Sequence, residues 1–239
     1  MGKAKQGADR GKTAPADWDG IVGTLEKWLA ELQSDQERPD GDLAVTTVAD
    51  NYRRDPWAVL SSTILSLRTK DEVTLVRSRA LLEKAPTPQK LLALSAEEIE
   101  KLIYPVGFYH TKARNLQKIA SAIIENHGGQ VPSTMDELLA LPGVGRKTAN
   151  LTLTEAFDLD GICVDVHVHR ITNRLGALQS KNPEETEMLL REILPKKYWR
   201  RLNMLLVLYG QRVCRPVSPF CSRCVIDRYC ERVGVERSR

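Results

Sequence analysis

Residues 141–150, which read LPGVGRKTAN, combine two glycines and a lysine in a pattern that can bind an anion and supply an amine. Pro142 ends an apolar helical stretch, and Gly143 and Gly145 allow a tight turn that leaves backbone N–H groups uncovered. A second helix starts directly after the turn. Amides at a helix N-terminus bind anions, and a DNA phosphate is the natural occupant here. Lys147 falls in the first turn of this second helix, beside the expected phosphate.

Two other interpretations of this segment remain. A nucleotide-binding P-loop needs a preceding strand and the sequence Gly-Lys-Ser/Thr, whereas here a helix precedes and Arg146 separates Gly145 from Lys147. An ordinary glycine-rich turn with a solvated lysine would show the same residues. Residues 134–137 have the Thr-x-x-Glu spacing of a capping box, which starts a helix just before the turn. The segment is therefore interpreted as a helix-hairpin-helix.

Four cysteines near the C-terminus form a second candidate site. Cys214, Cys221, Cys224 and Cys230 have six, two and five residues between them. Four thiolates in so short a segment can meet one centre, as in structural zinc sites and [4Fe–4S] clusters. Zinc sites more often pair two Cys-x2–4-Cys knuckles, and only one is present, so the spacing favours the cluster over zinc. Cys163 stands apart in an apolar context and is expected to be a buried, small hydrophobic residue.

The composition indicates a globular intracellular protein. Of the 239 residues 42% are hydrophobic, which is enough for one large domain or two small ones. No apolar run is long enough to span a bilayer, and the N-terminus has no signal-peptide core, so we expect no membrane association. An odd number of cysteines, clustered in this way, does not resemble a secreted disulfide framework.

Positive charge is concentrated at the C-terminal end. From Lys196 onward eleven Lys and Arg residues face three acidic ones, a balance of +8, whereas the rest of the chain carries −4. A basic segment on a nearly neutral body suits a polyanion such as DNA. A solvated basic face without a partner would give the same count.

The periodicity of the apolar residues predicts an all-α fold. Residues 1–17 are small, polar and basic, and we expect them to be disordered. The short β-like runs at 43–48 and 162–168 are the only strand signals. Helices are predicted at 18–32, 57–67, 71–84, 87–93, 95–103, 111–126, 146–157, 164–175, 182–194 and 198–214.

Three motifs in this order and at these distances resemble one known family. They are LPGVGRKTAN at 141–150, VDVHVHR at 164–170 and the cysteine array, and together they resemble endonuclease III, the helix-hairpin-helix DNA glycosylases with an iron–sulfur cluster. The resemblance runs from about residue 18 to residue 231.

The resemblance implies two all-α lobes with duplex DNA bound in the cleft between them. A six-helix barrel domain would span residues 49–158. The iron–sulfur cluster domain would combine an N-terminal helix at 18–48 with residues 159–239. The protein is expected to act as a monomer.

The resemblance also implies an activity, that of a bifunctional DNA glycosylase and AP lyase of base-excision repair acting on oxidised pyrimidines. Lys147 would attack C1′ of the flipped nucleotide and form a Schiff base, which acidifies the C2′ proton and permits β-elimination. Asp165 would assist the amine and stabilise positive charge on the sugar. Taken alone, Asp165 is better interpreted as a plain helix N-cap, and it is the surrounding match to the family that favours the catalytic role.

Several residues are expected to contact DNA. Where the family usually has a glutamine that fills the gap left by the flipped nucleotide, this chain has Leu67 and Arg68, and Phe108 stands where a leucine often acts as a wedge. His167 and Arg170 match the family motif, although both could equally belong to an ordinary helix face. With the hairpin turn, the expected DNA contacts are Gly143, Val144, Gly145, Arg146, His167, Arg170, Arg68 and Phe108.

Two alternative functions remain at this stage. A DNA-binding protein without catalysis could keep the hairpin and the cluster, but it would have no need for both Lys147 and Asp165. A glycosylase of the same superfamily with another base specificity would share all of these motifs.

Overall fold

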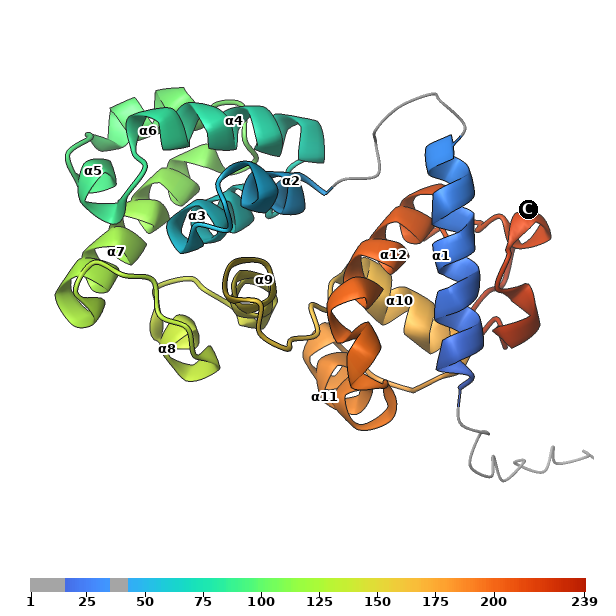
Figure 1. The fold of residues 1–239 in the computed structure, drawn as a ribbon. Coiled ribbons are helices and arrows are strands. Elements are labelled where there is room, and N and C mark those ends of the chain that lie inside the picture. The colour runs from blue at the N-terminus through green and yellow to red at the C-terminus, as the bar shows by residue number, and fades with distance from the viewer. Residues whose placement is uncertain (1–15, 35–42) are drawn as a thin grey trace, which may run out of the picture.

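The computed structural model describes residues 16–34 and 43–239, and in these ranges it contains twelve α-helices, three short 3-10 helices and no strand. Two groups of helices, each with its own core, form two lobes (Figure 1). The predicted all-α, two-lobe fold is thereby confirmed. Most of the predicted disordered segment 1–17 and of the polar linker after residue 33 lies outside the described residues. No helix in the described ranges is both long and apolar enough to cross a membrane.

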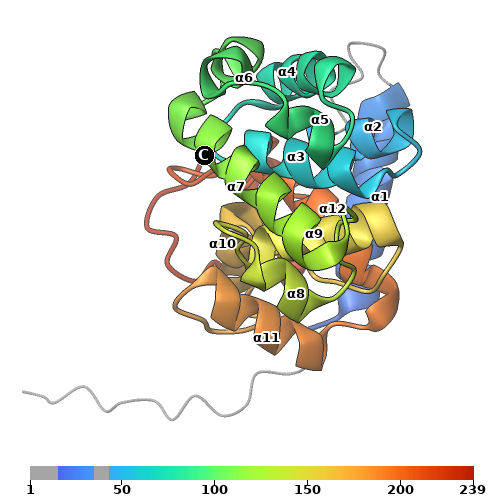
Figure 2. The same ribbon diagram turned by 90° about the vertical axis from the view of Figure 1, so that its left-hand side faces the viewer.

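The first lobe is built around a helix that is buried along almost its whole length. Nine consecutive residues of α3, from Trp57 to Leu65, are buried, and α2, α4, α7 and α9 pack around it (Figure 2). The first lobe contains eight helices, of which α5 and α8 are short connecting helices. The helices are α2 (Ala44–Asn51), α3 (Pro56–Ser66), α4 (Asp71–Lys84), α5 (Pro88–Leu92), α6 (Ala96–Ile103), α7 (Tyr109–His127), α8 (Met135–Ala140) and α9 (Arg146–Phe157).

Local capping interactions set where these helices begin. The Asp55 side chain accepts a hydrogen bond from the Ala58 amide at 2.8 Å, with proline at the first helical position of α3. Before α6, Ser95 and Glu98 form a reciprocal capping box, in which each side chain binds the backbone amide of the other residue. These boundaries follow from residues that are adjacent in the sequence.

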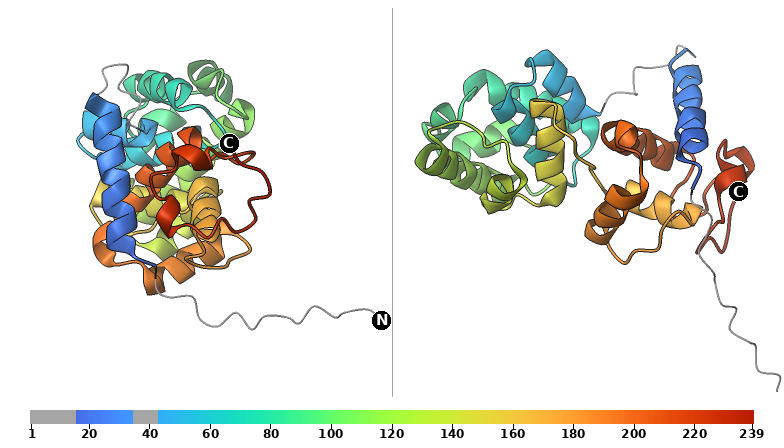
Figure 3. Two further views of the ribbon diagram at one scale, coloured as in Figure 1. Left: turned by 90° about the vertical axis from the view of Figure 1, so that its right-hand side faces the viewer. Right: turned by 60° about the horizontal axis from the view of Figure 1, so that its bottom comes forward.

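The second lobe joins the two ends of the described chain. Trp28 of α1 meets Tyr209 of α12 edge to face, with ring centroids 4.9 Å apart, and Ile21 and Leu25 are buried in the same core. Figure 3 shows α1 lying alongside α12 and the C-terminal segment. The lobe consists of α1 (Trp18–Ser34), α10 (Val166–Leu175), α11 (Pro183–Ile193), α12 (Trp199–Arg212) and the segment that carries the cysteines.

The structure divides residues 18–48 between the two lobes. Helix α2 begins at Ala44 and packs against α3, α4 and α9, so residues 44–48 lie in the first lobe although they were assigned with the N-terminal helix. Residues 44–48, whose sequence looked β-like, form a helix. Ala44, Val45, Val48 and Ala49 lie together on its buried face. In the other β-like run, residues 162–165 have no regular secondary structure, and α10 begins at Val166.

A buried ion-pair network ties the two lobes together. Glu187 of α11, whose side chain is only 3% exposed, receives two hydrogen bonds from Arg146 at the start of α9, at 2.9 and 2.7 Å. Arg191 binds the same carboxylate at 3.0 and 3.1 Å. Burial alone would raise the pKa of Glu187, but the hydrogen bonds from Arg146 and Arg191 hold this pKa below its usual value.

This network predicts a measurable contribution to stability. Glu187→Gln should lower the free energy of unfolding at pH 7 by about 2 kcal/mol, because two arginines would remain beside an uncharged partner and both are partly solvated. The contribution of a carboxylate with a lowered pKa is complete above the unfolded value of about 4.3 and is lost as the pH falls through the folded value. The difference in the free energy of unfolding between Glu187→Gln and wild type should therefore become smaller below about pH 4.

The measurement is denaturant unfolding of both proteins across this pH range. Glu192→Gln, an exposed position on the same helix, is the matched control and should leave stability within about 0.5 kcal/mol. If the two variants were equally stable at pH 7, the stabilising role of the Glu187 network would be contradicted.

Candidate active site

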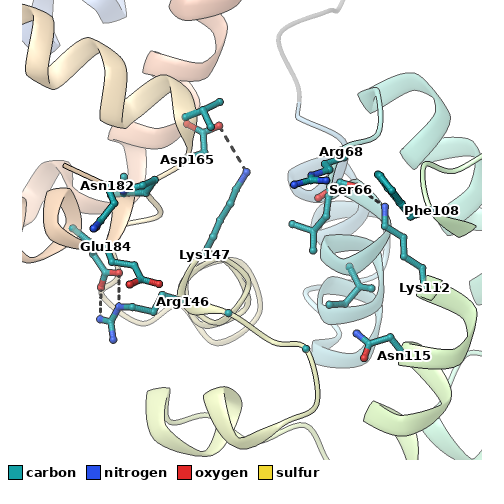
Figure 4. Close-up of a pocket in the computed structure, with 18 of the residues that line it drawn as sticks. Ser66, Arg68, Phe108, Lys112, Asn115, Arg146, Lys147, Asp165, Asn182 and Glu184 are labelled. Atoms are coloured by element: carbon teal, nitrogen blue, oxygen red, sulfur yellow. Dashed lines mark hydrogen bonds and ion pairs between the residues drawn. The ribbon is translucent and has the colours of Figure 1, made fainter. Parts of the chain in front are cut away.

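The two lobes enclose a cleft of about 1140 Å³. Figure 4 shows Lys147 and Asp165 on one side of it, and Arg68, Phe108 and Lys112 on the other. Residues from both lobes line the cleft, so its shape depends on how α9 and α10 are held together. The hairpin turn forms part of its edge.

The two glycines of the hairpin turn have different structural roles. Gly143 has a φ of +70°, and a Cβ there would come within 2.6 Å of the Asn115 side chain, so this position requires glycine. Gly145 is the N-cap of α9 with an ordinary φ of −97°, and a Cβ there would meet no protein atom within 4 Å. Since no side chain caps α9, its first amides remain open to an anion approaching past Gly145.

Lys147 and Asp165 face each other across the junction of the lobes. The Nζ of Lys147 lies 3.7 Å from Oδ2 of Asp165, and the lysine side chain is 40% exposed against 10% for the aspartate. The other carboxylate oxygen, Oδ1, accepts hydrogen bonds from the amides of His167 at 2.8 Å and Val168 at 3.0 Å. Asp165 therefore caps α10 with one oxygen and presents the second to the amine. The interpretation of Asp165 as a helix N-cap is confirmed, and its second oxygen is left for the role that the family resemblance implies.

Arg68 and Phe108 form a pair on the opposite wall. The guanidinium carbon of Arg68 lies 5.5 Å from the centre of the Phe108 ring. The Phe108 side chain is largely exposed, as 62% of the residue is accessible. Both residues have left-handed backbone conformations, with φ of 54° and 60°. An exposed aromatic ring and an arginine thus lie together on this wall of the cleft.

Three residues predicted to contact DNA are bound within the protein. Arg146 is held by Glu187. Arg170 donates to the carbonyl oxygen of Cys214 at 2.9 Å and to that of Gly210 at 3.3 Å, so it links α10 to the end of α12. Its Nη2 also lies 3.1 Å from Nδ1 of His167, and burial lowers the pKa of that histidine. These side chains position elements, and of the three only Arg146 and His167 reach the cleft.

The four cysteines lie around one small cavity. Cys224 Sγ accepts a hydrogen bond from the Tyr209 hydroxyl at 3.2 Å, and Cys214 Sγ one from Arg174 at 3.5 Å. Among the described residues, no three His, Cys, Asp or Glu side chains converge closely enough to hold one metal ion. Cys163 is buried away from the four cysteines, and burial raises its pKa to about 12.

Much of the C-terminal positive charge is paired within the protein. Lys197 binds Asp19 at 2.7 Å, and Arg201 binds Glu26 at 3.0 Å. Further arginines stack on rings, including Arg223 at 4.3 Å from the centre of Phe220. The excess charge counted from sequence is thus only partly available to an external polyanion.

Two features of the cleft were missed by sequence reasoning. Lys112 is buried on α7, and its position in line with Leu116 and Ile119 on the apolar face is a signal that could have identified it. Asn182 and Glu184, at the start of α11, line the cleft near Asp165 (Figure 4). Their approach to Asp165 depends on the packing of α11, which no local pattern reveals.

Comparison with known proteins gives consistent matches along the chain. Residues 61–196 match the family model described as HhH-GPD superfamily base excision DNA repair protein. Endonuclease III of Thermotoga maritima is 45% identical over 177 residues, which cover 74% of this chain and 83% of that protein. Endonuclease III of Bacillus subtilis is 35% identical over 200 residues, covering 83% and 91%.

Solved structures agree with these matches. A non-covalent endonuclease III–DNA complex superimposes with a TM-score of 0.74 at 33% identity, covering 90% of this chain and 95% of that one. A trapped endonuclease III–DNA covalent intermediate gives the same TM-score and coverage at 32% identity. The chain belongs to the endonuclease III family of HhH-GPD base excision DNA repair proteins, and it is a DNA glycosylase and AP lyase.

Proposed function

We propose that this chain removes oxidised pyrimidines from duplex DNA with Lys147 as the nucleophile and Asp165 as its acid–base partner. The observation that carries the proposal is the approach of these two side chains, 3.7 Å apart inside the cleft. A phosphate bound at the hairpin turn would place the neighbouring sugar beside them, since Lys147 lies in the first turn of α9.

The lysine is suited to attack on the sugar. A neutral Lys147 amine attacks C1′ of the flipped nucleotide, and the damaged base leaves with the bonding electron pair of the glycosidic bond. Loss of a proton from nitrogen and opening of the sugar ring give a Schiff base. The Schiff base acidifies the C2′ proton. Removal of that proton expels the 3′ phosphate by β-elimination.

The aspartate is suited to help because only one of its oxygens is used in capping. The free Oδ2 can accept a proton from the Lys147 amine and can stabilise positive charge as it develops on the sugar.

Arg68 and Phe108 are proposed to fill the space that the flipped nucleotide vacates. Phe108 would enter the base stack as a wedge, and Arg68 would face the unpaired base. Their position opposite Lys147 supports this division of the cleft into a gap-filling wall and a reacting wall.

We further propose that Cys214, Cys221, Cys224 and Cys230 hold a [4Fe–4S] cluster, with structural zinc as the alternative. The four residues line one cavity, and nearby donors to sulfur stabilise thiolate charge, including the Arg232 amide 3.4 Å from Cys230. The spacing contains only one Cys-x2-Cys pair, whereas zinc sites more often have two such pairs. When bound, the cluster would supply the structural centre of the C-terminal segment. Reduced thiolates and a DNA substrate suit an intracellular location.

The role of Lys147 predicts covalent trapping on lesion-containing DNA. Borohydride should trap the wild-type protein by reducing the Schiff base to a stable amine, and Lys147→Ala should abolish trapping while leaving DNA binding nearly intact. Lys84→Ala, an exposed position outside the cleft, is the control and should trap fully. Trapping by Lys147→Ala would show that another amine attacks.

The proposed catalytic role of Asp165 can be separated from its capping function by measuring excision and stability on one variant. Asp165→Asn should fold normally, since asparagine caps a helix about as well as aspartate, but base removal should slow by at least ~10²-fold. The measurements are single-turnover excision and the thermal unfolding midpoint. Full activity of this variant would leave Asp165 as a cap alone.

The hairpin turn predicts a binding defect without a folding defect. Gly145→Val should preserve stability, because the backbone conformation is ordinary and space is open, yet it should weaken duplex DNA binding about tenfold for all sequences alike. Fluorescence anisotropy measures the affinity. Gly23→Val, at another position with open space around the added Cβ, should bind DNA normally. If Gly145→Val bound DNA with unchanged affinity, the proposal that a phosphate binds at this turn would be contradicted.

The cysteine array predicts iron in the purified protein. We expect broad visible absorption and about four irons per chain. Cys221→Ser should lower the iron content and the thermal midpoint, whereas Cys163→Ala should leave the iron content unchanged. A colourless protein with one zinc per chain would contradict the cluster and support a structural zinc site.

A further inference from the structure

Lys112 is a buried lysine whose three protons all have acceptors. The residue is 6% exposed, and its Nζ donates to the carbonyl oxygen of Leu65 at 2.8 Å, to that of Leu67, and to the Thr69 hydroxyl at 3.1 Å. The two carbonyls lie at the C-terminal end of α3, where helix carbonyls lack partners and positive charge is favourable. One ammonium group thus satisfies the end of α3 from a different helix, α7.

Thr69 extends this contact to the loop before α7. Its hydroxyl oxygen also accepts a hydrogen bond from the Gly107 amide at 3.2 Å. A Cβ on Gly107 would come within 2.5 Å of the Arg68 carbonyl oxygen, so the two backbones touch at this point. The segments 67–69 and 104–108 are therefore joined through Lys112, Thr69 and the close approach at Gly107.

The two joined segments carry Arg68 and Phe108, both in the left-handed region that side chains other than glycine rarely adopt. Such conformations persist where the surroundings fix them. Here the fixing contacts come from the residues beside each of them, Thr69 beside Arg68 and Gly107 beside Phe108.

We propose that Lys112 is a positioning residue that holds Arg68 and Phe108 as one rigid unit by tying the end of α3 to the start of α7. The inference rests on the proposed function, which assigns these two residues to the gap left by the flipped nucleotide. A preformed unit enters the duplex without first ordering two separate loops, so Lys112 acts on base flipping and not on the chemistry at C1′.

A second nucleophile is the competing role for this lysine, since burial lowers its pKa to about 8. The geometry argues against that role. All three protons are engaged, and a neutral amine would leave one acceptor without a donor. Lys147, with a side chain 40% exposed and facing Asp165, is the amine available to a sugar.

The test compares two substrates in the same duplex, a paired oxidised pyrimidine and a pre-formed abasic site. Lys112→Met keeps the length of the side chain without its donors. It should slow excision of the paired lesion at least about tenfold, while cleavage of the abasic site changes less than about threefold. A 2-aminopurine base opposite the lesion should show a smaller fluorescence rise than with wild type, because fewer duplexes are opened.

Controls separate positioning from general damage. Lys118→Met, an exposed lysine on the same helix, should match wild type on both substrates. If Lys112→Met does not fold, Thr69→Val removes the hydroxyl that joins the two segments and should give the same selective loss. Equal loss on both substrates, or no loss, would overturn the positioning role. Failure of the wild-type protein to be trapped by borohydride would instead contradict the proposed function.

Discussion

The contact on which the active site depends most is the ion pair between Arg146 and Glu187. Lys147 belongs to the first lobe and Asp165 to the second, so their 3.7 Å approach exists only while the lobes keep one relative position. Arg146 is the residue directly before Lys147, and its two hydrogen bonds to buried Glu187 fix the start of α9 against α11. An arginine with two parallel hydrogen bonds defines direction as well as distance, which a single lysine contact would not.

Several residues of the site serve the fold and, in the proposed function, also the chemistry. Asp165 divides its two oxygens between the cap of α10 and the amine. Gly143 keeps the turn closed, whereas Gly145 leaves open the path to the helix amides. This sharing places the reactive groups on helix ends, where the backbone itself is fixed, and it limits the freedom lost when substrate binds.

The sequence predicts the parts of this structure that depend on neighbouring residues. Three to five consecutive residues determine each of these parts. They are the start of α3, the capping box at Ser95 and the hairpin turn. The motif spacing also paired Lys147 with Asp165, through family resemblance. The ion pair of Arg146 with Glu187 was not predicted, because the two residues are 41 positions apart and meet only when α9 packs against α11. Likewise the acceptors of Lys112 are 43 to 47 residues distant.

The second lobe is assembled from both ends of the described chain, with the whole first lobe between them. Helix α1 packs against α12, so its buried residues Ile21 and Leu25 have no complete core until α12 has been made. During synthesis from the N-terminus, the first lobe can close around α3 while α1 waits on the growing chain. The hairpin turn and Lys147 are then in place before Asp165 has a lobe to hold it. A nascent chain would gain the hairpin turn first, and it would acquire the paired amine and carboxylate only when its last helices are released.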